Sequence, residues 1–286
     1  MKRIAYGCLA LTGCLMFSTP AQSQILKNIG KKLEQRAEKV IDKGLEDVLS
    51  SPSATANPSE MAPNDDISTR SSGQTGPFKN IPLLENDFIR GDEVIFFDDF
   101  SEEKMGKMAS KWTSNGTGTV QAVEGFDGAW LKLFDANTYK IKPLVRIPEN
   151  FTVEFDLLTL SSSENKFQVD FGFDYQQGVG RHYYLAYQNP VNIEASYQFN
   201  HFNFNSNEVT PNKKSEIEAN MSYFVNDIMK VKLKVEGDRM SAYVNEYKVL
   251  DTEMIDPATK KYFYIGVNNE KNESNIFISN VRISKL

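Results

Sequence analysis

Residues Val94 to Leu133 read VIFFDDFSEEKMGKMASKWTSNGTGTVQAVEGFDGAWLKL, and this stretch decides the fold class of the 286-residue chain. We interpret it as the first edge of a large β-sandwich. No catalytic constellation accompanies it. The stretch therefore indicates an architecture more clearly than an activity, and the function has to be sought in the rest of the sequence.

Alternating apolar and polar residues mark several strands further along the chain. In Phe151–Leu157 the residues Phe, Val, Phe and Leu share one face while Thr, Glu and Asp share the other, and Phe167–Phe173 repeat this pattern. A period of two predicts β-strands. A glycine turn at Gly237 predicts a hairpin, and the phase slip at Ser279-Asn280 predicts a β-bulge. We expect residues 82–286 to form an all-β, two-sheet antiparallel jelly-roll sandwich.

The amino-terminal residues 1–23 have the pattern of a signal peptide. Lys2 and Arg3 are cationic, an apolar run extends from Ile4 to Phe17, and small residues follow it. This run is shorter than the roughly 20 residues that a membrane-spanning helix needs. We therefore expect a periplasmic or secreted protein with no transmembrane span. The alternative is an outer-membrane lipoprotein, because Leu11 to Cys14 fits a lipobox.

A helix and a linker are predicted between this leader and the sandwich. Residues 24–49 form an amphipathic helix in this interpretation, since apolar residues recur there at roughly 3.6-residue spacing. Its role would be self-association or docking on a partner through residues 25–49. Residues 50–81 are rich in Ser, Pro, Ala, Asn and Thr. Such a segment buries too little surface to offset the entropy of ordering, which predicts a flexible, disordered linker.

Five segments occur in a characteristic order: Phe97 to Ser101, Lys111-Trp112, Gly128 to Leu133, Phe151 to Asp156 and the closing Asn280-Val281-Arg282-Ile283. This ordered series resembles the concanavalin A-like lectin/glucanase sandwich in its laminin-G-like form. The resemblance covers about Asp92 to Leu286 and implies a fold shared by lectins, carbohydrate-binding modules, adhesion domains and glycoside hydrolases.

The whole chain is also similar to exported proteins of Gram-negative bacteria in which a helical segment, a linker and this sandwich precede an outer-membrane protein A type domain. The sequence ends with the sandwich at Leu286, so peptidoglycan anchoring by that route is not carried over from the resemblance.

A carboxylate pair in the sandwich corresponds to half of a hydrolase motif. Hydrolases of this class carry Glu-x-Asp-x-x-Glu, or one spacer fewer, on one strand, with one carboxylate as nucleophile and one as acid. Glu154 and Asp156 have the first spacing, but Leu158 and Thr159 stand where the second glutamate would be. We expect this pair to be solvated surface, so the chain is more consistent with a binding protein than with an enzyme.

Metal and cofactor chemistry has few candidates. Asp98 and Asp99 offer hard oxygen ligands for calcium near the first strand, and the preferred alternative is that one of them accepts backbone hydrogen bonds at the strand end. No phosphate loop or nucleophile motif occurs, so no other cofactor is expected. Both cysteines, Cys8 and Cys14, lie in the leader. A mature protein without cysteines has no disulfide bonds.

The segment Arg181–Asn205, RHYYLAYQNPVNIEASYQFNHFNFN, is the richest in candidate binding residues. Alternation predicts that Phe202 and Phe204 face the core. The residues predicted to face outward are His182, Tyr184, His201, Asn203 and Asn205. Aromatic rings stack on the apolar faces of sugars, and amides bind their hydroxyls. The alternative is an ordinary polar outer face.

The net charge of the chain limits the classes of partner that it is expected to bind. The net charge of −6 disfavours nucleic acid, because an acidic surface repels phosphate. We therefore expect an exported, non-enzymatic binding module for carbohydrate or a cell-envelope protein. The alternative is a glycan-processing hydrolase of the concanavalin A-like class.

Overall fold

The structure, a computed structural model of the chain, describes residues 76–78, 86–142, 145, 147–161, 167–179, 190–269 and 274–286. The predicted leader 1–23, the predicted helix 24–49, most of the predicted linker, and His182 and Tyr184 lie outside the described residues. The described ranges are almost entirely β-structure, with one short 3-10 helix, η2 (Met221–Phe224). None of their helical segments has the length and apolarity to cross a bilayer.

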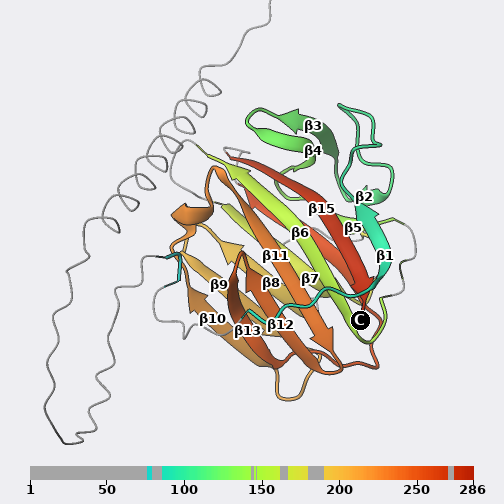
Figure 1. The fold of residues 1–286 in the computed structure, drawn as a ribbon, viewed down its shortest axis with the longest axis vertical. Coiled ribbons are helices and arrows are strands. Elements are labelled where there is room, and N and C mark those ends of the chain that lie inside the picture. Colours follow the sequence, from blue (N-terminus) through green and yellow to red (C-terminus); the bar gives the residue numbers. More distant parts are fainter. Residues whose placement is uncertain are drawn as a thin grey trace, which may run out of the picture. The chain divides into compact units, whose positions relative to one another are not determined.

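Two antiparallel sheets lie one over the other (Figure 1). The eight-stranded sheet contains β1 (Glu93–Asp98), β3 (Gly118–Val123), β4 (Phe126–Leu133), β6 (Phe151–Leu160), β11 (Asp227–Glu236), β12 (Arg239–Val244), β13 (Tyr247–Glu253) and β15 (Asn275–Lys285). Its order is β13-β12-β11-β6-β15-β4-β3, with β1 added on β15.

The seven-stranded sheet contains β2 (Trp112–Ser114), β5 (Thr138–Ile141), β7 (Phe167–Asp174), β8 (Val191–Ser196), β9 (His201–Ser206), β10 (Lys213–Glu218) and β14 (Tyr262–Asn269). Its order is β10-β9-β8-β7-β14-β5-β2. The predicted all-β, two-sheet antiparallel sandwich is confirmed.

The core lies between β6 and β7, the central strands whose alternation the sequence displays. Phe151 of β6 meets Phe173 of β7 with ring centroids 5.3 Å apart, and Phe155 meets Phe171 at 5.2 Å. Both pairs are edge-to-face, an arrangement that contributes about 0.5–1.5 kcal/mol per pair beyond the burial of area. The aromatic alternation therefore joins the two sheets directly.

The predicted hairpin and bulge are both present. Gly237, between β11 and β12, has a φ of 62°, which a residue without a Cβ adopts at little cost. The register between β6 and β15 shifts between Ser279 and Arg282. Asn280 inside this shift has a φ of 53°. The shift lets apolar side chains on both parts of β15 face the core.

The opening stretch Val94–Leu133 contributes strands to both sheets. β1, β3 and β4 belong to the eight-stranded sheet, whereas β2 pairs with β5 of the other. Trp112 and Trp130 are both buried, and Trp112 belongs to the core. The stretch therefore connects the two layers rather than forming one edge.

Phe78 belongs to the core although it lies within the range predicted as linker. Its ring centroid is 5.2 Å from that of Tyr247 and 6.0 Å from that of Phe202. The carbonyl of Pro77 accepts a hydrogen bond from the amide of Asn220 at 2.7 Å. Residues 76–78 are therefore packed against the sandwich.

Candidate functional site

The described members of the predicted binding set lie together on the outer face of the seven-stranded sheet. His201, Asn203 and Asn205 are partly exposed along β9, while Phe202 and Phe204 are buried in the core. The alternation predicted for this strand is confirmed. A row of imidazole and amide groups therefore follows β9, and its role in binding stays a prediction.

A hollow of about 430 Å³ lies where β8 turns into β9 and continues against β10. We call it the turn hollow; its lining includes Phe199, His201, Glu216, Glu218 and Asn220. The Phe199 side chain is 64% exposed, and its ring centroid lies 6.0 Å from the His201 imidazole with 30° between the planes. The exposed Phe199 ring thus lies beside an imidazole that is mostly covered.

Phe199 is absent from the residues predicted by alternation, because it lies in a turn rather than a strand. The turn runs from Tyr197 to Asn200, and Asn200 adopts a φ of 57°. The available signal was a large aromatic residue in a polar turn between two strands. A turn tip has no buried side to fill, so alternation could not place this ring on either face.

Carboxylates surround the imidazole of His201. Its Nε2 lies 3.2 Å from Oε1 of Glu194, and its Nδ1 lies 3.6 Å from Oε1 of Glu216. The Asn205 amide donates to Oδ1 of Asn203 at 3.2 Å. Carboxylate and amide oxygens accept hydrogen bonds from hydroxyl groups, and amide nitrogens donate to them. The turn hollow therefore combines the Phe199 and His201 rings with the carboxylates of Glu216 and Glu218, and the amides of Asn203 and Asn205 continue along β9.

A buried polar network lies on the same face, over β7, β8 and β14. The Asn192 amide donates to Oδ1 of Asp170 at 3.1 Å, Gln168 donates to Oδ2 at 2.9 Å, and the Tyr264 hydroxyl donates to the Asn192 carbonyl oxygen. Burial raises the pKa of Asp170 to about 7, against the lowering effect of these hydrogen bonds. Burial therefore favours the neutral form of Asp170 over the ionised form more than it would at an exposed site.

A buried ion pair extends the network towards β5. Nζ of Lys140 lies 2.5 Å from Oδ2 of Asp174, and it also donates to the carbonyl oxygens of Gln176 and Gly178. Buried charges require such compensation, because removing one partner leaves the other charge unpaired.

Asp98 and Asp99, the predicted calcium ligands, both accept hydrogen bonds at the end of β1. Asp98 accepts from the Phe100 amide at 3.2 Å and from the Trp112 indole at 2.9 Å. Asp99 accepts from the amide and hydroxyl of Ser101. Burial raises the pKa of Asp98, and the Ser101 hydrogen bonds lower the pKa of Asp99.

These contacts match the preferred alternative to calcium binding, in which one of the two aspartates accepts backbone hydrogen bonds at the strand end. Within the described part of the chain, no group of three or more His, Cys, Asp or Glu side chains is arranged to hold a metal ion. Calcium at Asp98 and Asp99 stays a prediction, which a calcium titration followed by thermal unfolding would test.

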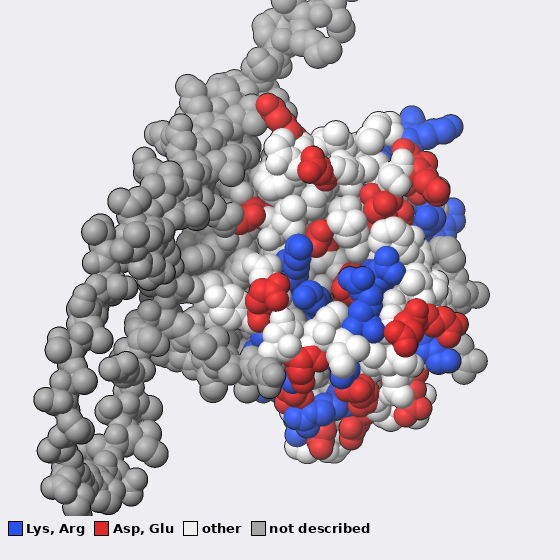
Figure 2. Space-filling view, in the orientation of Figure 1, with Lys and Arg blue, Asp and Glu red and all other residues white. Residues whose placement is uncertain are grey.

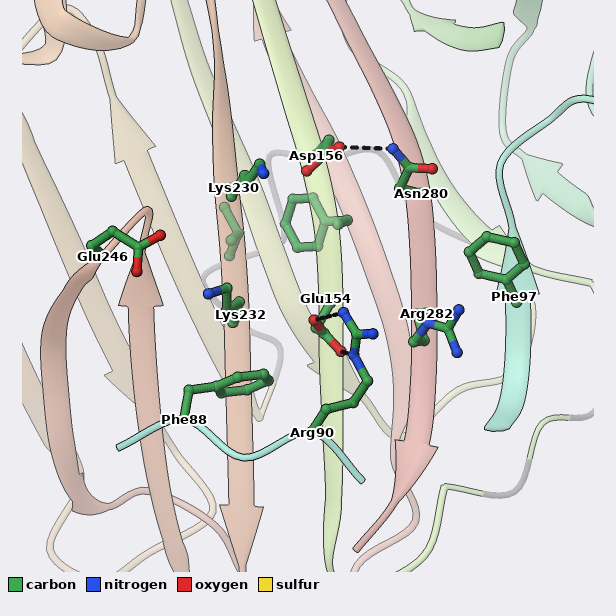
Figure 3. A pocket seen from close by; sticks show the side chains of 12 residues that line it. Phe88, Arg90, Phe97, Glu154, Asp156, Lys230, Lys232, Glu246, Asn280 and Arg282 are labelled. Atoms are coloured by element: carbon green, nitrogen blue, oxygen red, sulfur yellow. Dashed lines mark hydrogen bonds and ion pairs between the residues drawn. The ribbon is translucent and has the colours of Figure 1, made fainter. Parts of the chain in front are cut away.

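Glu154 and Asp156 project from the outer face of the other sheet into a separate groove (Figure 3). The Arg90 guanidinium forms a bidentate ion pair with Glu154, with N–O distances of 2.6 and 2.7 Å. This contact explains why Glu154 is buried although the sequence suggests a solvated carboxylate. Leu158 and Thr159 are fully buried and bring no third carboxylate to the groove.

Comparisons with known proteins find a likeness in fold only. No protein-family model matches the sequence, and no curated protein matches it. Among solved structures, the chain is similar to a sialidase with a TM-score of 0.47 and 16% identity, over 69% of this chain and 19% of the sialidase. The chain thus spans less than a fifth of that protein.

Two smaller proteins are similar over nearly their whole length. The carbohydrate-binding module CBM66 from Bacillus subtilis has a TM-score of 0.42 and 13% identity, over 64% of this chain and 99% of the module. Arcelin-5, a lectin-like defense protein from Phaseolus vulgaris, has a TM-score of 0.46 and 10% identity, over 64% of this chain and 96% of arcelin-5. At these scores and identities the likenesses assign neither a family nor a ligand.

Proposed function

We propose that this chain is an exported, non-enzymatic module that binds carbohydrate at the turn hollow and along β9. The observation that carries the proposal is the exposed Phe199 ring beside His201, with the amides of Asn203 and Asn205 further along the same face of β9. A sugar ring stacks its apolar face on such aromatic surfaces, while its hydroxyls pair with amides and carboxylates. A volume of about 430 Å³ falls in the usual range for small-ligand sites.

A cell-envelope protein is the alternative partner, and the same surface would then be its docking site. The hydrolase alternative has less support, because Glu154 is held by Arg90 and lies on the opposite sheet from the turn hollow. A nucleophile or acid must be able to approach the glycosidic bond. A carboxylate engaged by both oxygens is not free to do so.

The test is a glycan array with the full chain and with Phe199→Ala. We expect the wild type to bind a defined set of glycans and Phe199→Ala to lose about two- to tenfold in affinity for them, since an aromatic stacking contact contributes roughly 0.5–1.5 kcal/mol. Tyr175→Ala is the matched control. Tyr175 is 48% exposed and follows β7 at the end of the sheet away from Phe199, as the β7–β8 and β8–β9 registers require.

Three results would contradict the proposal. One is equal binding by wild type and Phe199→Ala. Another is an equal loss in Tyr175→Ala. The third is binding to a cell-envelope protein without binding to any glycan.

A further inference from the structure

A second hollow, of about 540 Å³, lies on the outer face of the eight-stranded sheet. We call it the cationic groove; the residues that matter are Phe88, Arg90, Phe97, Glu154, Asp156, Lys230, Lys232 and Arg282. Figure 3 shows its floor on β11, β6 and β15, with the segment carrying Phe88 and Arg90 crossing one end and Phe97 of β1 at the side. The turn hollow lies on the other sheet.

Strand register sets the pattern of charges on this floor. Lys232 on β11 and Arg282 on β15 are both direct cross-strand neighbours of Glu154 on β6. Lys230 is the neighbour of Asp156. Cross-strand neighbours have Cβ atoms about 4.5–5.5 Å apart. Glu154 is therefore flanked by a cation on each side.

Arg90 changes the balance of positive and negative charge among these cross-strand neighbours. Because both oxygens of Glu154 are taken by the Arg90 guanidinium, Lys232 and Arg282 are left without a neutralising partner. Asp156 accepts a hydrogen bond from the Asn280 amide at 2.7 Å. Among the described residues, neither Lys230, Lys232 nor Arg282 forms an ion pair.

Aromatic rings hold two of these cations in place without neutralising them. Nζ of Lys232 lies 5.3 Å from the centroid of the Phe88 ring, and Cζ of Arg282 lies 4.6 Å from that of Phe97. Cation–π contacts at these distances orient a cation and leave its hydrogen-bond donors available. The groove thus presents cationic side chains whose positions are already set by aromatic contacts.

The cationic cluster contrasts with the charge of the chain as a whole. Figure 2 shows basic side chains gathered near the middle of this face with acidic side chains around them. The net charge is −6, so at long range the protein repels anions. An anionic ligand would gain from this site only through direct contact within the groove, where the local cations outweigh the distant charge.

The charged side chains that line the groove indicate the chemical class of its ligand. Free cations bind a carboxylate or sulfate, and Arg pairs with such groups bidentately. Asp156 and the rim residue Glu246 add acceptors, which suit hydroxyl donors and would repel a bare anion. The floor strands β11 and β6 are paired on both sides, so no free strand edge is available there for an extended peptide. We propose that the cationic groove binds an acidic saccharide, with Lys230, Lys232 and Arg282 contacting its anionic group.

The experiment is isothermal titration calorimetry of the full chain with trigalacturonic acid, its neutral methyl ester and a sulfated heparin disaccharide. We expect one or both acidic saccharides to bind, the ester to bind at least about tenfold more weakly, and added salt to weaken the acidic complex. Lys230→Gln/Lys232→Gln is expected to lose about tenfold or more in affinity, because two charge-assisted contacts are removed.

Lys104→Gln/Lys107→Gln is the matched control, since both lysines are exposed and lie outside the groove. It should bind as the wild type does, and circular dichroism should show all variants folded. The proposal is overturned if neither acidic saccharide binds, if the ester binds as tightly as the acid, or if the groove variant keeps full affinity. Equal binding of a hexaglutamate peptide would overturn the saccharide class.

Discussion

Asp170 is a carboxyl group almost fully buried at the centre of the seven-stranded sheet's outer face. Its partners, Asn192 and Gln168, donate hydrogen bonds that favour the ionised form, yet burial outweighs them and raises its pKa to about 7. A buried carboxyl of this kind makes folding stability depend on pH near neutrality.

The sign of that dependence follows from the protons bound. In the unfolded chain Asp170 loses its proton near its ordinary pKa of about 3.9, while in the folded chain it keeps the proton until about pH 7. The contribution of the protonated Asp170 carboxyl to the free energy of unfolding is therefore complete below about pH 4, and it is lost as the pH rises to about 7. The free energy of unfolding of the wild type should fall, relative to that of Asp170→Asn, by up to about 4 kcal/mol over this window. Urea unfolding from pH 4 to 8 checks this; parallel curves would contradict it.

Asp98 permits a prediction of a different kind, because its oxygens hold the end of β1 to Trp112. Asp98→Ala leaves the buried Phe100 amide and the Trp112 indole without their acceptor. We expect a loss of about 2–4 kcal/mol in the free energy of unfolding, measured by urea with tryptophan fluorescence. Asp98→Asn keeps one acceptor oxygen and should lose clearly less. Equal losses in both variants would argue against the hydrogen-bond explanation.

At the scale of elements, the segment Asn86–Gly91 lies against the eight-stranded sheet in close contact. The Gly91 amide donates to the Thr152 hydroxyl at 3.3 Å, and the preceding residue, Arg90, forms the ion pair with Glu154. A Cβ on Gly91 would lie 2.3 Å from the backbone oxygen of Lys285. The segment can therefore approach the sheet only because this position is glycine.

Gly91→Ala should destabilise the fold by about 1–3 kcal/mol, since the clash is with backbone and cannot be relieved by a side-chain movement. Gly178→Ala is the control, because no atom lies within 4 Å of the added methyl group. Thermal unfolding of both variants measures the difference. A Gly91→Ala protein with the wild-type melting temperature would show that the segment is not held in this position.

The strands that the sequence predicts well are those with one face in the core. Phe151–Leu157 of β6 and β7 alternate regularly because each must fill the interior on one side. The contact of Arg90 with Glu154 was not predictable, since the partners are 64 residues apart and no periodicity marks the segment. Phe199 was missed for a related reason: it lies in a turn, where packing imposes no pattern. Sequence patterns record burial, whereas these two sites depend on long-range contact and on exposure.

At the scale of the whole molecule, the two hollows lie on the outer faces of opposite sheets. Packed sheets are about 10 Å apart, with the apolar core between them. Sites separated in this way, with no shared side chains, usually act independently.

We therefore expect Phe199→Ala to leave the affinity for acidic saccharide unchanged and Lys230→Gln/Lys232→Gln to leave the binding of neutral glycans on the array unchanged. The combined variant should lose both, with effects that add within about 0.5 kcal/mol. Titration of each ligand in the presence and absence of the other measures any coupling. A change in one affinity on saturation of the other site would show that the faces communicate.

The burial of Phe78 determines where a stable proteolytic fragment begins. Cleavage after Phe78, for example at Pro82, would remove a ring packed on Phe202 and Tyr247 and would leave the Asn220 amide without the Pro77 carbonyl. Loss of a buried phenyl ring from a core costs about 3–5 kcal/mol. A protease-resistant fragment should therefore retain Gly76 to Phe78, and an expressed domain starting at Pro82 should melt earlier and aggregate more readily than one that starts before Gly76.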